Sequence, residues 1–209
     1  MEKIVPLFPL SLVVFPNSYY PLRIFEDRYK SMIMNCRKYK LPFAIIAVLD
    51  GKIVPVGTLV RIVQLIAKFD DGSFDIVVKG KERVKIARSW KHSIGYDEGL
   101  IEEVPDEAVN ADVVLVDELE KRFKQLLGKV NVKLEDNFWF NLSFSPTKSF
   151  KVAEKSGISL NQQLELLALT TEEDRILYLL DHFVNIEKYL SNREVVSSLI
   201  LNDGYINTK

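Results

Sequence analysis

The chain opens on Ile4-Val5-Pro6-Leu7-Phe8-Pro9-Leu10, followed by Val13-Val14-Phe15-Pro16 and by Pro21-Leu22-Arg23-Ile24-Phe25. Prolines break all of these apolar runs. Because proline has no N–H to donate to a β-ladder, such runs suit strand ends and strand edges rather than one long central strand. A charged amphipathic segment begins directly afterwards at Glu26. The opening therefore predicts short strands followed at once by a helix.

The hydrophobic period changes twice over the next stretch. Residues 26–39 place four apolar side chains on one helical face: Tyr29, Met32, Ile33 and Cys36. This spacing predicts a helix that ends before Pro42. The uninterrupted apolar run 43–48 that follows has the length of a strand and predicts one that is buried on both faces.

The remainder of the first half alternates as strands do. Residues 54–69 are rich in β-branched side chains, and Asp70-Asp71-Gly72-Ser73 predicts a hairpin turn after them. Alternation resumes over 74–87 but is interrupted by Gly80, which predicts a bulge or sharp bend of the kind that a closed or nearly closed barrel needs. A further strand is predicted over 95–104.

From Pro105-Asp106 onward the pattern becomes helical. Val116, Leu119, Phe123 and Leu126 share one face, and Gly128 is the predicted end of that helix. Further helices are predicted at 136–143 and after the cap Ser145-Pro146, with Gly157 ending the latter. Two capping boxes are predicted, Ser159 with Gln162 and Thr170 with Glu173. The last predicted helix carries an apolar stripe: Ile176, Leu180, Phe183, Ile186 and Leu190.

These patterns predict an α+β protein with a β-rich part at 1–104 and a helical part at 105–209. The 209 residues are 47% hydrophobic, which is enough for a core without metal or disulfide. Basic and acidic residues number 28 and 29, so nothing attracts nucleic acid or an anionic membrane over long range. The lone Cys36 is interpreted as a small apolar filler, and the missing signal peptide and membrane span favour the cytoplasm.

Little in the sequence suggests catalysis or a cofactor. His92 and His182 are interpreted as structural, since no Gly-x-Ser-x-Gly elbow accompanies them, and neither a zinc-ligand spacing nor a P-loop is present. The basic residues of one segment (Lys79, Lys81, Arg83, Lys85 and Arg88) are interpreted as the wet face of a strand. The alternative is an RNA-binding surface.

Several motifs resemble one known family. The opening Val5–Leu10 with Val14–Pro16 and Pro21–Tyr29 is similar to the start of the Lon protease N-terminal domain. A second similarity runs from Gly57-Thr58 through Asp71-Gly72 to Val78–Ile86, and a weaker one covers 164–180. The resemblance implies a PUA-like β pseudo-barrel followed by a helical bundle. It also implies a non-catalytic domain that recognises unfolded or tagged polypeptides, here as a stand-alone version without the ATPase and peptidase domains.

We therefore expect a polypeptide-binding module without a cofactor that works with unfolded chains and with a protease or chaperone partner. Binding through apolar grooves and free strand edges needs no particular sequence. The candidate contact residues are aromatic: Phe8, Phe15, Tyr19, Tyr20 and Phe25. The alternative function is an RNA-binding PUA-like module.

Overall fold

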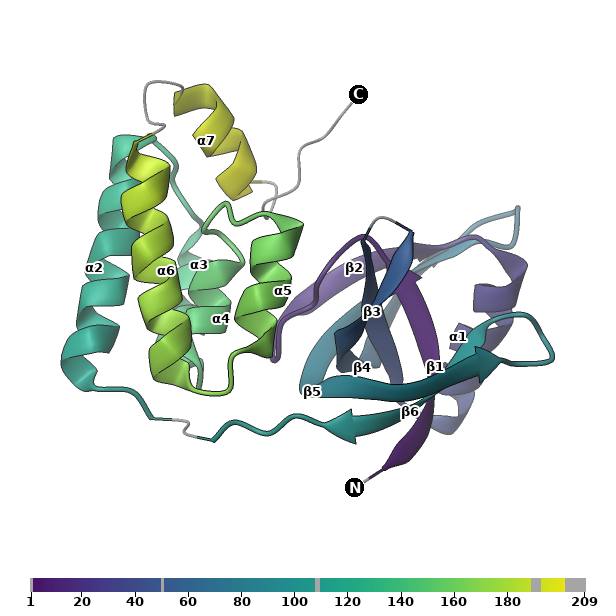
Figure 1. Cartoon of the computed structure of the whole chain (residues 1–209). Helices are drawn as coiled ribbons and strands as arrows, with labels where there is room; N and C mark the ends of the chain where they lie inside the picture. The colour runs from purple at the N-terminus through teal and green to yellow at the C-terminus, as the bar shows by residue number, and fades with distance from the viewer. Residues whose placement is uncertain (1, 50, 108–109, 189–192, 202–209) are drawn as a thin grey trace. The chain divides into compact units, whose positions relative to one another are not determined.

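The structure is a computed structural model that describes residues 2–49, 51–107, 110–188 and 193–201. The chain divides into two compact units, Met1–Pro105 and Asp106–Lys209 (Figure 1). The first unit, called the β unit, contains β1 (Lys3–Leu10), β2 (Tyr19–Ile24), α1 (Asp27–Tyr39), β3 (Phe43–Leu49), β4 (Lys52–Lys68), β5 (Phe74–Lys91) and β6 (Asp97–Glu103). The second, called the helical unit, contains α2 (Val113–Lys129), α3 (Asp136–Phe144), α4 (Lys148–Ala153), α5 (Leu160–Ala168), α6 (Glu172–Glu187) and α7 (Arg193–Leu201). The predicted α+β class is confirmed.

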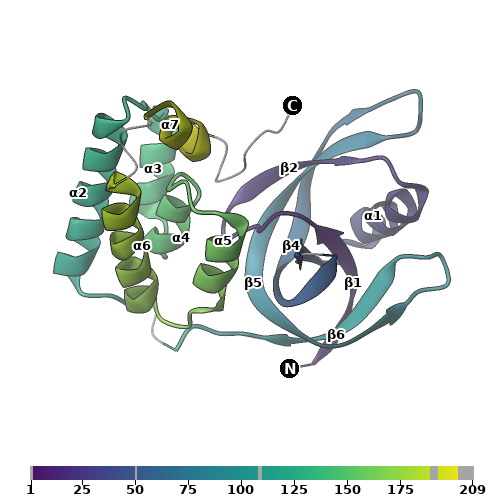
Figure 2. The same ribbon diagram turned by 45° about the horizontal axis from the view of Figure 1, so that its top comes forward.

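The strands of the β unit form a six-stranded sheet in the order β2-β5-β4-β3-β1-β6. β5 also pairs with β6, so β1, β3, β4, β5 and β6 close into a ring. The β1–β3 pair is parallel and the other pairs are antiparallel. β5 is long enough to serve two neighbours, because residues 74–79 pair with β2 and residues 84–91 pair with β6. Its long curved ribbon can be followed in Figure 2.

Both faces of the central strands are buried, which explains the uninterrupted apolar run of β3. On one face lies a cluster to which every strand of the ring contributes: Val5, Leu7, Ala44, Ile46, Leu59, Val84 and Ile101. On the other face, Phe43 and Ile45 belong to a larger cluster that includes the predicted stripe of α1. The helix over 26–39 and the doubly buried strand are therefore confirmed.

Gly80 is the point at which β5 passes from one neighbour to the other. A Cβ atom on Gly80 would lie 2.1 Å from the carbonyl oxygen of Phe15, a distance that no real Cβ allows. The close approach is held by two backbone hydrogen bonds, from the Gly80 N–H to the Ser18 carbonyl (2.9 Å) and from the Asn17 N–H to the Gly80 carbonyl (3.1 Å). The β4–β5 register shifts beside it, between Thr58 and Val60. The irregularity predicted at Gly80 is confirmed.

The helical unit is organised around the fully buried guanidinium of Arg175 in α6. Arg175 donates both Nη groups to the two carboxylate oxygens of Asp106, at 2.9 and 3.0 Å. Its Nη2 also reaches Glu172 (3.1 Å), and its Nε donates to Ser149 Oγ (3.2 Å) in α4. A buried guanidinium is tolerated only when its donors are satisfied in this way. The network therefore fastens the start of the unit to α4 and α6.

One of these predicted helix ends is correct and the others are displaced. Ser159 caps α5 in the expected capping box with Gln162. Gly157 takes a left-handed φ of 70° but does not end the helix before it, because α4 already ends at Ala153 with Glu154 as its cap. The helix predicted to end at Gly128 instead continues to Lys129, because Asn131 supplies the left-handed residue (φ 57°) that follows it. The α4 helix begins at Lys148 after the cap residue Thr147, not after Ser145.

The cap of α6 lies one residue beyond the predicted Thr170. Thr171 accepts a hydrogen bond from the Asp174 N–H, whereas the Thr170 hydroxyl donates to Glu107 Oε1 (2.9 Å). The buried stripe of α6 is Ile176, Leu179, Phe183 and Ile186, and Leu180 is only half-buried. Leu190 lies outside the described residues. No helix among the described residues has the length and apolarity needed to cross a membrane.

The first testable consequence concerns the crossing at Gly80. Gly80→Ala should destabilise the β unit by roughly 3 kcal/mol, because the new methyl group meets a backbone carbonyl that cannot rotate away. Gly128→Ala is the control, since its Cβ meets nothing within 4 Å and a helical alanine should add about 0.5–1 kcal/mol. Urea unfolding measures both variants. Equal stability of Gly80→Ala and the parent would contradict the described crossing.

A second consequence concerns pH. The His182 ring donates from Nε2 to the Ser156 carbonyl (2.9 Å), and its Nδ1 faces the Gln162 amide nitrogen (3.3 Å). Burial lowers the pKa of His182, against smaller opposing effects of the Ser156 bond and of Asp181. The unfolded chain therefore takes up this proton at a higher pH than the folded one. The contribution of neutral His182 to the free energy of unfolding is therefore fully present above the pKa of the unfolded state, about 6.5, and is lost as the pH falls below that value.

We expect the free energy of unfolding of the helical unit to decrease between about pH 7 and about pH 5.5. In His182→Gln, which cannot titrate, that decrease should become smaller. Chemical denaturation at several pH values, monitored by circular dichroism, gives both slopes. Identical slopes in the parent and the variant would show that His182 is not buried in its neutral form.

Candidate functional site

The five aromatic residues that the sequence offered as contacts divide by accessibility. Phe8 and Phe15 are each only 4% exposed. The Phe8 ring lies 4.5 Å from the ring of Tyr29, and the Phe15 carbonyl lies over Gly80. Tyr20 is half-buried against the α1 cluster. Tyr19 and Phe25 are 61% and 64% exposed, so only these two are freely accessible on the folded surface.

Tyr19 belongs to a broad exposed surface on β2, β5 and β4. Inward-facing residues of these strands pack in the α1 cluster, and the alternate residues face the other way. Paired Cα positions across the three strands form three outward rows: Tyr19–Lys79–Arg61, Pro21–Val77–Gln64 and Arg23–Asp75–Ala67. Together with Val63, Ile66 and Phe69, these rows define what we call the β2–β5–β4 face.

Two irregularities in β4 enlarge the apolar part of this face. Against β5, the register of β4 shifts between Ile62 and Gln64 and again between Leu65 and Ala67. Val63 and Ile66 are the extra residues at these β-bulges, and both are exposed, Ile66 by 52%. Bulges commonly re-aim a side chain in this way. The sequence shows only a long β-branched run here, and nothing in it marks the bulged positions.

Cationic side chains lie on the aromatic rings of the face. The guanidinium carbon of Arg23 is 4.0 Å from the centroid of the Phe69 ring, and the Lys79 ammonium is 5.0 Å from that of Tyr19. Such cation–π contacts hold the long basic side chains close to the apolar surface. The face therefore combines exposed apolar groups with positive charge at both ends.

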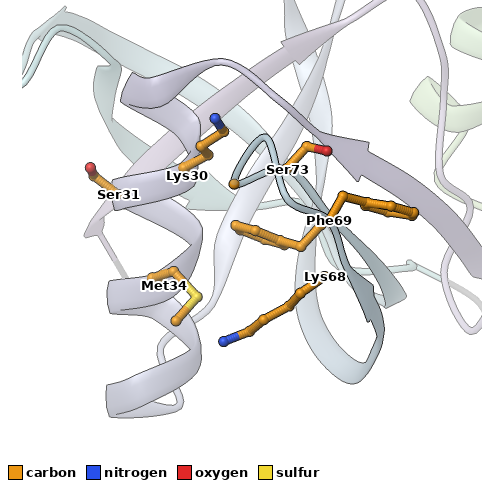
Figure 3. Close-up of a pocket in the computed structure, with 8 residues that line it drawn as sticks. Lys30, Ser31, Met34, Lys68, Phe69 and Ser73 are labelled. Carbon is orange, nitrogen blue, oxygen red and sulfur yellow. The ribbon is translucent and has the colours of Figure 1, made fainter.

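A pocket of about 420 Å³ adjoins the face where the β4–β5 turn approaches α1 (Figure 3). Lys30, Ser31 and Met34 of α1 line one side, and Lys68, Phe69, Gly72, Ser73 and Phe74 line the other. Figure 3 shows the Lys30 and Lys68 side chains on opposite walls of the pocket. Phe69 belongs to both the pocket and the β2–β5–β4 face, so the two surfaces are continuous.

Hydrogen bonds within the turn fix the shape of the pocket. Asp71 Oδ1 accepts from the N–H (2.9 Å) and the Oγ (2.6 Å) of Ser73, which lowers the pKa of the Asp71 carboxyl. Lys30 Nζ reaches the Asp71 carbonyl (3.3 Å), and Arg23 Nη2 donates to Ser73 Oγ (3.2 Å). The turn is thereby fastened to both α1 and β2.

The groups that were considered for catalysis have structural surroundings. His92 stacks on Tyr96 at 4.4 Å and accepts from the Ile94 N–H, while both ring nitrogens of His182 face partners in the helical unit. Burial raises the pKa of the Cys36 thiol to about 11, so it is no nucleophile at neutral pH. Within the part of the chain that the structure describes, no three His, Cys, Asp or Glu side chains gather as metal ligands would.

The basic segment of β5 does not form one continuous patch. Arg83 is buried and donates to the Pro105 carbonyl (3.3 Å), and Lys85 lies opposite Glu102 of β6. The register shift between Gly80 and Arg83 disrupts the period of two on which the expected single face depended. Lys79 belongs to the β2–β5–β4 face instead.

The fold and this face define an α+β protein that presents an exposed apolar and cationic sheet surface. A family model described as the ATP-dependent protease La (LON) substrate-binding domain matches residues 4–185. The chain belongs to this family. No curated protein matches it significantly.

Solved structures agree with the family. A Lon N-terminal domain protein from Xanthomonas campestris is 27% identical with a TM-score of 0.64, and the match covers 86% of this chain and 98% of that one. The N-terminal domain of a Mycobacterium avium complex Lon protease, at 19% identity, shares the fold with a TM-score of 0.64 over 88% of this chain and 99% of that one.

Proposed function

We propose that the protein is a non-catalytic polypeptide-binding module whose β2–β5–β4 face receives apolar segments of unfolded or tagged chains. The observation that carries the proposal is the group of exposed apolar side chains on this one face: Tyr19, Val63, Ile66 and Phe69. Single exposed apolar residues are common, but several of them on the same side of a sheet indicate an interaction surface. The family's description as a substrate-binding domain supports the same function.

The face is a better candidate than the free edge of the sheet. Among the described strands β2 pairs only with β5, so its other edge is open in principle to strand addition. However, Pro21 lies in the middle of β2 and removes one donor from any new ladder. Binding through side chains of the face does not depend on this missing N–H donor. It also suits a broad range of unfolded sequences, since apolar contact is non-directional.

The fold type of the two units and the partner of the protein are proposed from the family. In this proposal the β unit is a PUA-like pseudo-barrel, the helical unit is a helical bundle that supports it, and a protease or chaperone in the cytoplasm uses the bound chain. The ring closed by β5 and the buried Arg175 network support the first two points. No specific observation favours RNA binding, because the basic segment of β5 is divided by the burial of Arg83.

The direct test compares two tyrosines of the β unit. Tyr19→Ser should weaken binding of a labelled, permanently unfolded apolar polypeptide by about tenfold, because it removes the exposed aromatic ring of the first row, over which the Lys79 ammonium lies. Tyr39→Ser is a matched control: Tyr39 is 60% exposed and is also covered by a cation, but lies at the end of α1, away from the face. Fluorescence anisotropy gives both affinities.

A second pair repeats the comparison for aliphatic residues, with Ile66→Ser on the face and Leu177→Ser on α6. Circular dichroism and urea unfolding confirm that each variant remains folded. If the control variants weaken binding as much as the variants of the face, the proposed surface is wrong.

A further inference from the structure

We propose that the β2–β5–β4 face selects extended segments in which acidic residues flank apolar ones. This inference rests on the proposed function, because it names the class of polypeptide that the same face receives. Three features of the face support it: its excess of positive charge, the fixed position of that charge, and the spacing between its charged ends.

The charge on the face is mainly positive. Arg61 and Lys79 lie in the first row and Arg23 in the third, where Asp75 of β5 is paired with Arg23 and is the carboxylate of the three rows. Asp75 is half-buried, and its Oδ1 has no hydrogen-bond partner among the described residues. Within the described parts of the chain, none of the three cations forms an ion pair with a carboxylate, although Arg23 interacts electrostatically with Asp71, to which Ser73 connects it. An acidic ligand would therefore find cations that no direct internal ion pair occupies.

The cations are also held in place before any ligand arrives. The guanidinium of Arg23 lies over the Phe69 ring and donates from Nη2 to Ser73 Oγ, and the Lys79 ammonium lies over the ring of Tyr19. An arginine that stacks on a ring still presents the edge of its guanidinium for paired hydrogen bonds to a carboxylate. Because these side chains are already ordered next to apolar surface, less rotamer entropy is lost when a carboxylate binds.

The spacing sets the pattern of the ligand. Arg23 is paired with Asp75, which lies four positions before Lys79 along β5. Along β2, Tyr19 likewise lies four positions before Arg23. At about 3.3 Å per residue the two charged rows lie roughly 13 Å apart. Between them lie Pro21 and Val77, with the bulged Val63 and Ile66 alongside. An extended ligand thus matches the face when two acidic residues stand four positions apart with apolar residues between them.

Like charge should exclude the opposite class of ligand. A segment with lysine in place of the acidic residues brings ammonium groups next to Arg23, Arg61 and Lys79, and such juxtaposition opposes binding even when the apolar contacts are unchanged. The preference should be strongest at low ionic strength, because the charged groups lie on the surface.

The experiment uses three labelled peptides with the same apolar residues and the same length. The two flanking positions, four apart, are glutamate in the first, glutamine in the second and lysine in the third. With the whole protein, we expect the glutamate peptide to bind about tenfold more tightly than the lysine peptide, and the glutamine peptide to lie between them. A fourth peptide, with two adjacent glutamates, tests the spacing and should bind more weakly than the first.

Charge reversal supplies the matched variants. Lys79→Glu and Arg23→Glu should each abolish the preference for the glutamate peptide. Lys38→Glu should leave it intact, since the Lys38 ammonium lies 4.9 Å from the centroid of the Tyr39 ring in an equivalent pair outside the face. Circular dichroism confirms that every variant is folded.

These experiments distinguish failure of the preference for acidic segments from failure of the proposed polypeptide-binding function. Equal affinity for all peptides, with binding still weakened in Tyr19→Ser, overturns the charge preference and leaves the polypeptide-binding module standing. No binding of any peptide overturns both. Binding of structured RNA that disappears in Lys79→Glu and falls steeply with salt, without peptide binding, would identify a nucleic-acid surface and also overturns both.

Discussion

The β unit depends on the passage of residues 15–18 across β5 at Gly80. At this point one strand has to leave the ladder with β2 and enter the ladder with β6, and the chain segment between β1 and β2 has to lie directly against it. Only glycine permits the contact, because a Cβ atom would occupy the position of the Phe15 carbonyl oxygen. The closed ring and the additional strand β2 are thus two consequences of one close approach. Without this close approach at Gly80, β5 could not pair with both β2 and β6.

The proposed site follows from the same arrangement. Residues 74–79 of β5 lie outside the part that pairs with β6, so together with β2 and the end of β4 they extend the sheet beyond the ring. One side of this extension is buried by the α1 cluster, and the other side is exposed. The exposed side is therefore rigid, because its backbone is fixed by the packed side. A rigid surface loses little entropy on binding, which suits the recognition of a flexible chain.

Sequence patterns predicted the elements of this fold better than its surface. The doubly buried β3 and the stripe of α1 were correct because continuous apolar runs and helical periods report burial directly. Helix ends were displaced at Gly128 and Thr170, where Asn131 and Thr171 perform the same roles within a few residues. Arg175 was overlooked, because a charged residue on a helix is usually solvated. Its burial depends on Asp106, which lies far away in the sequence.

Aromatic character alone did not predict which of the candidate contact residues are accessible. Phe8 and Phe15 stand in the same proline-broken opening as Tyr19, yet both are buried: Phe8 lies in the paired strand β1, and Phe15 lies in the segment that crosses Gly80. The exposure of Val63 and Ile66 was not predicted, because exposure at a β-bulge depends on the partner strand, which no local pattern reveals. Phe69 follows the end of β4 at the turn, where the hydrophobic pattern of a strand gives no information. The most direct measurement is therefore a residue-by-residue map of binding, from the amide NMR chemical shifts of the protein with and without an unfolded apolar polypeptide. We expect the shift changes to concentrate in residues 19–23, 61–69 and 75–79. Shifts that concentrate in the helical unit or on the exposed side of α1, with the β2–β5–β4 face unchanged, would contradict this expectation.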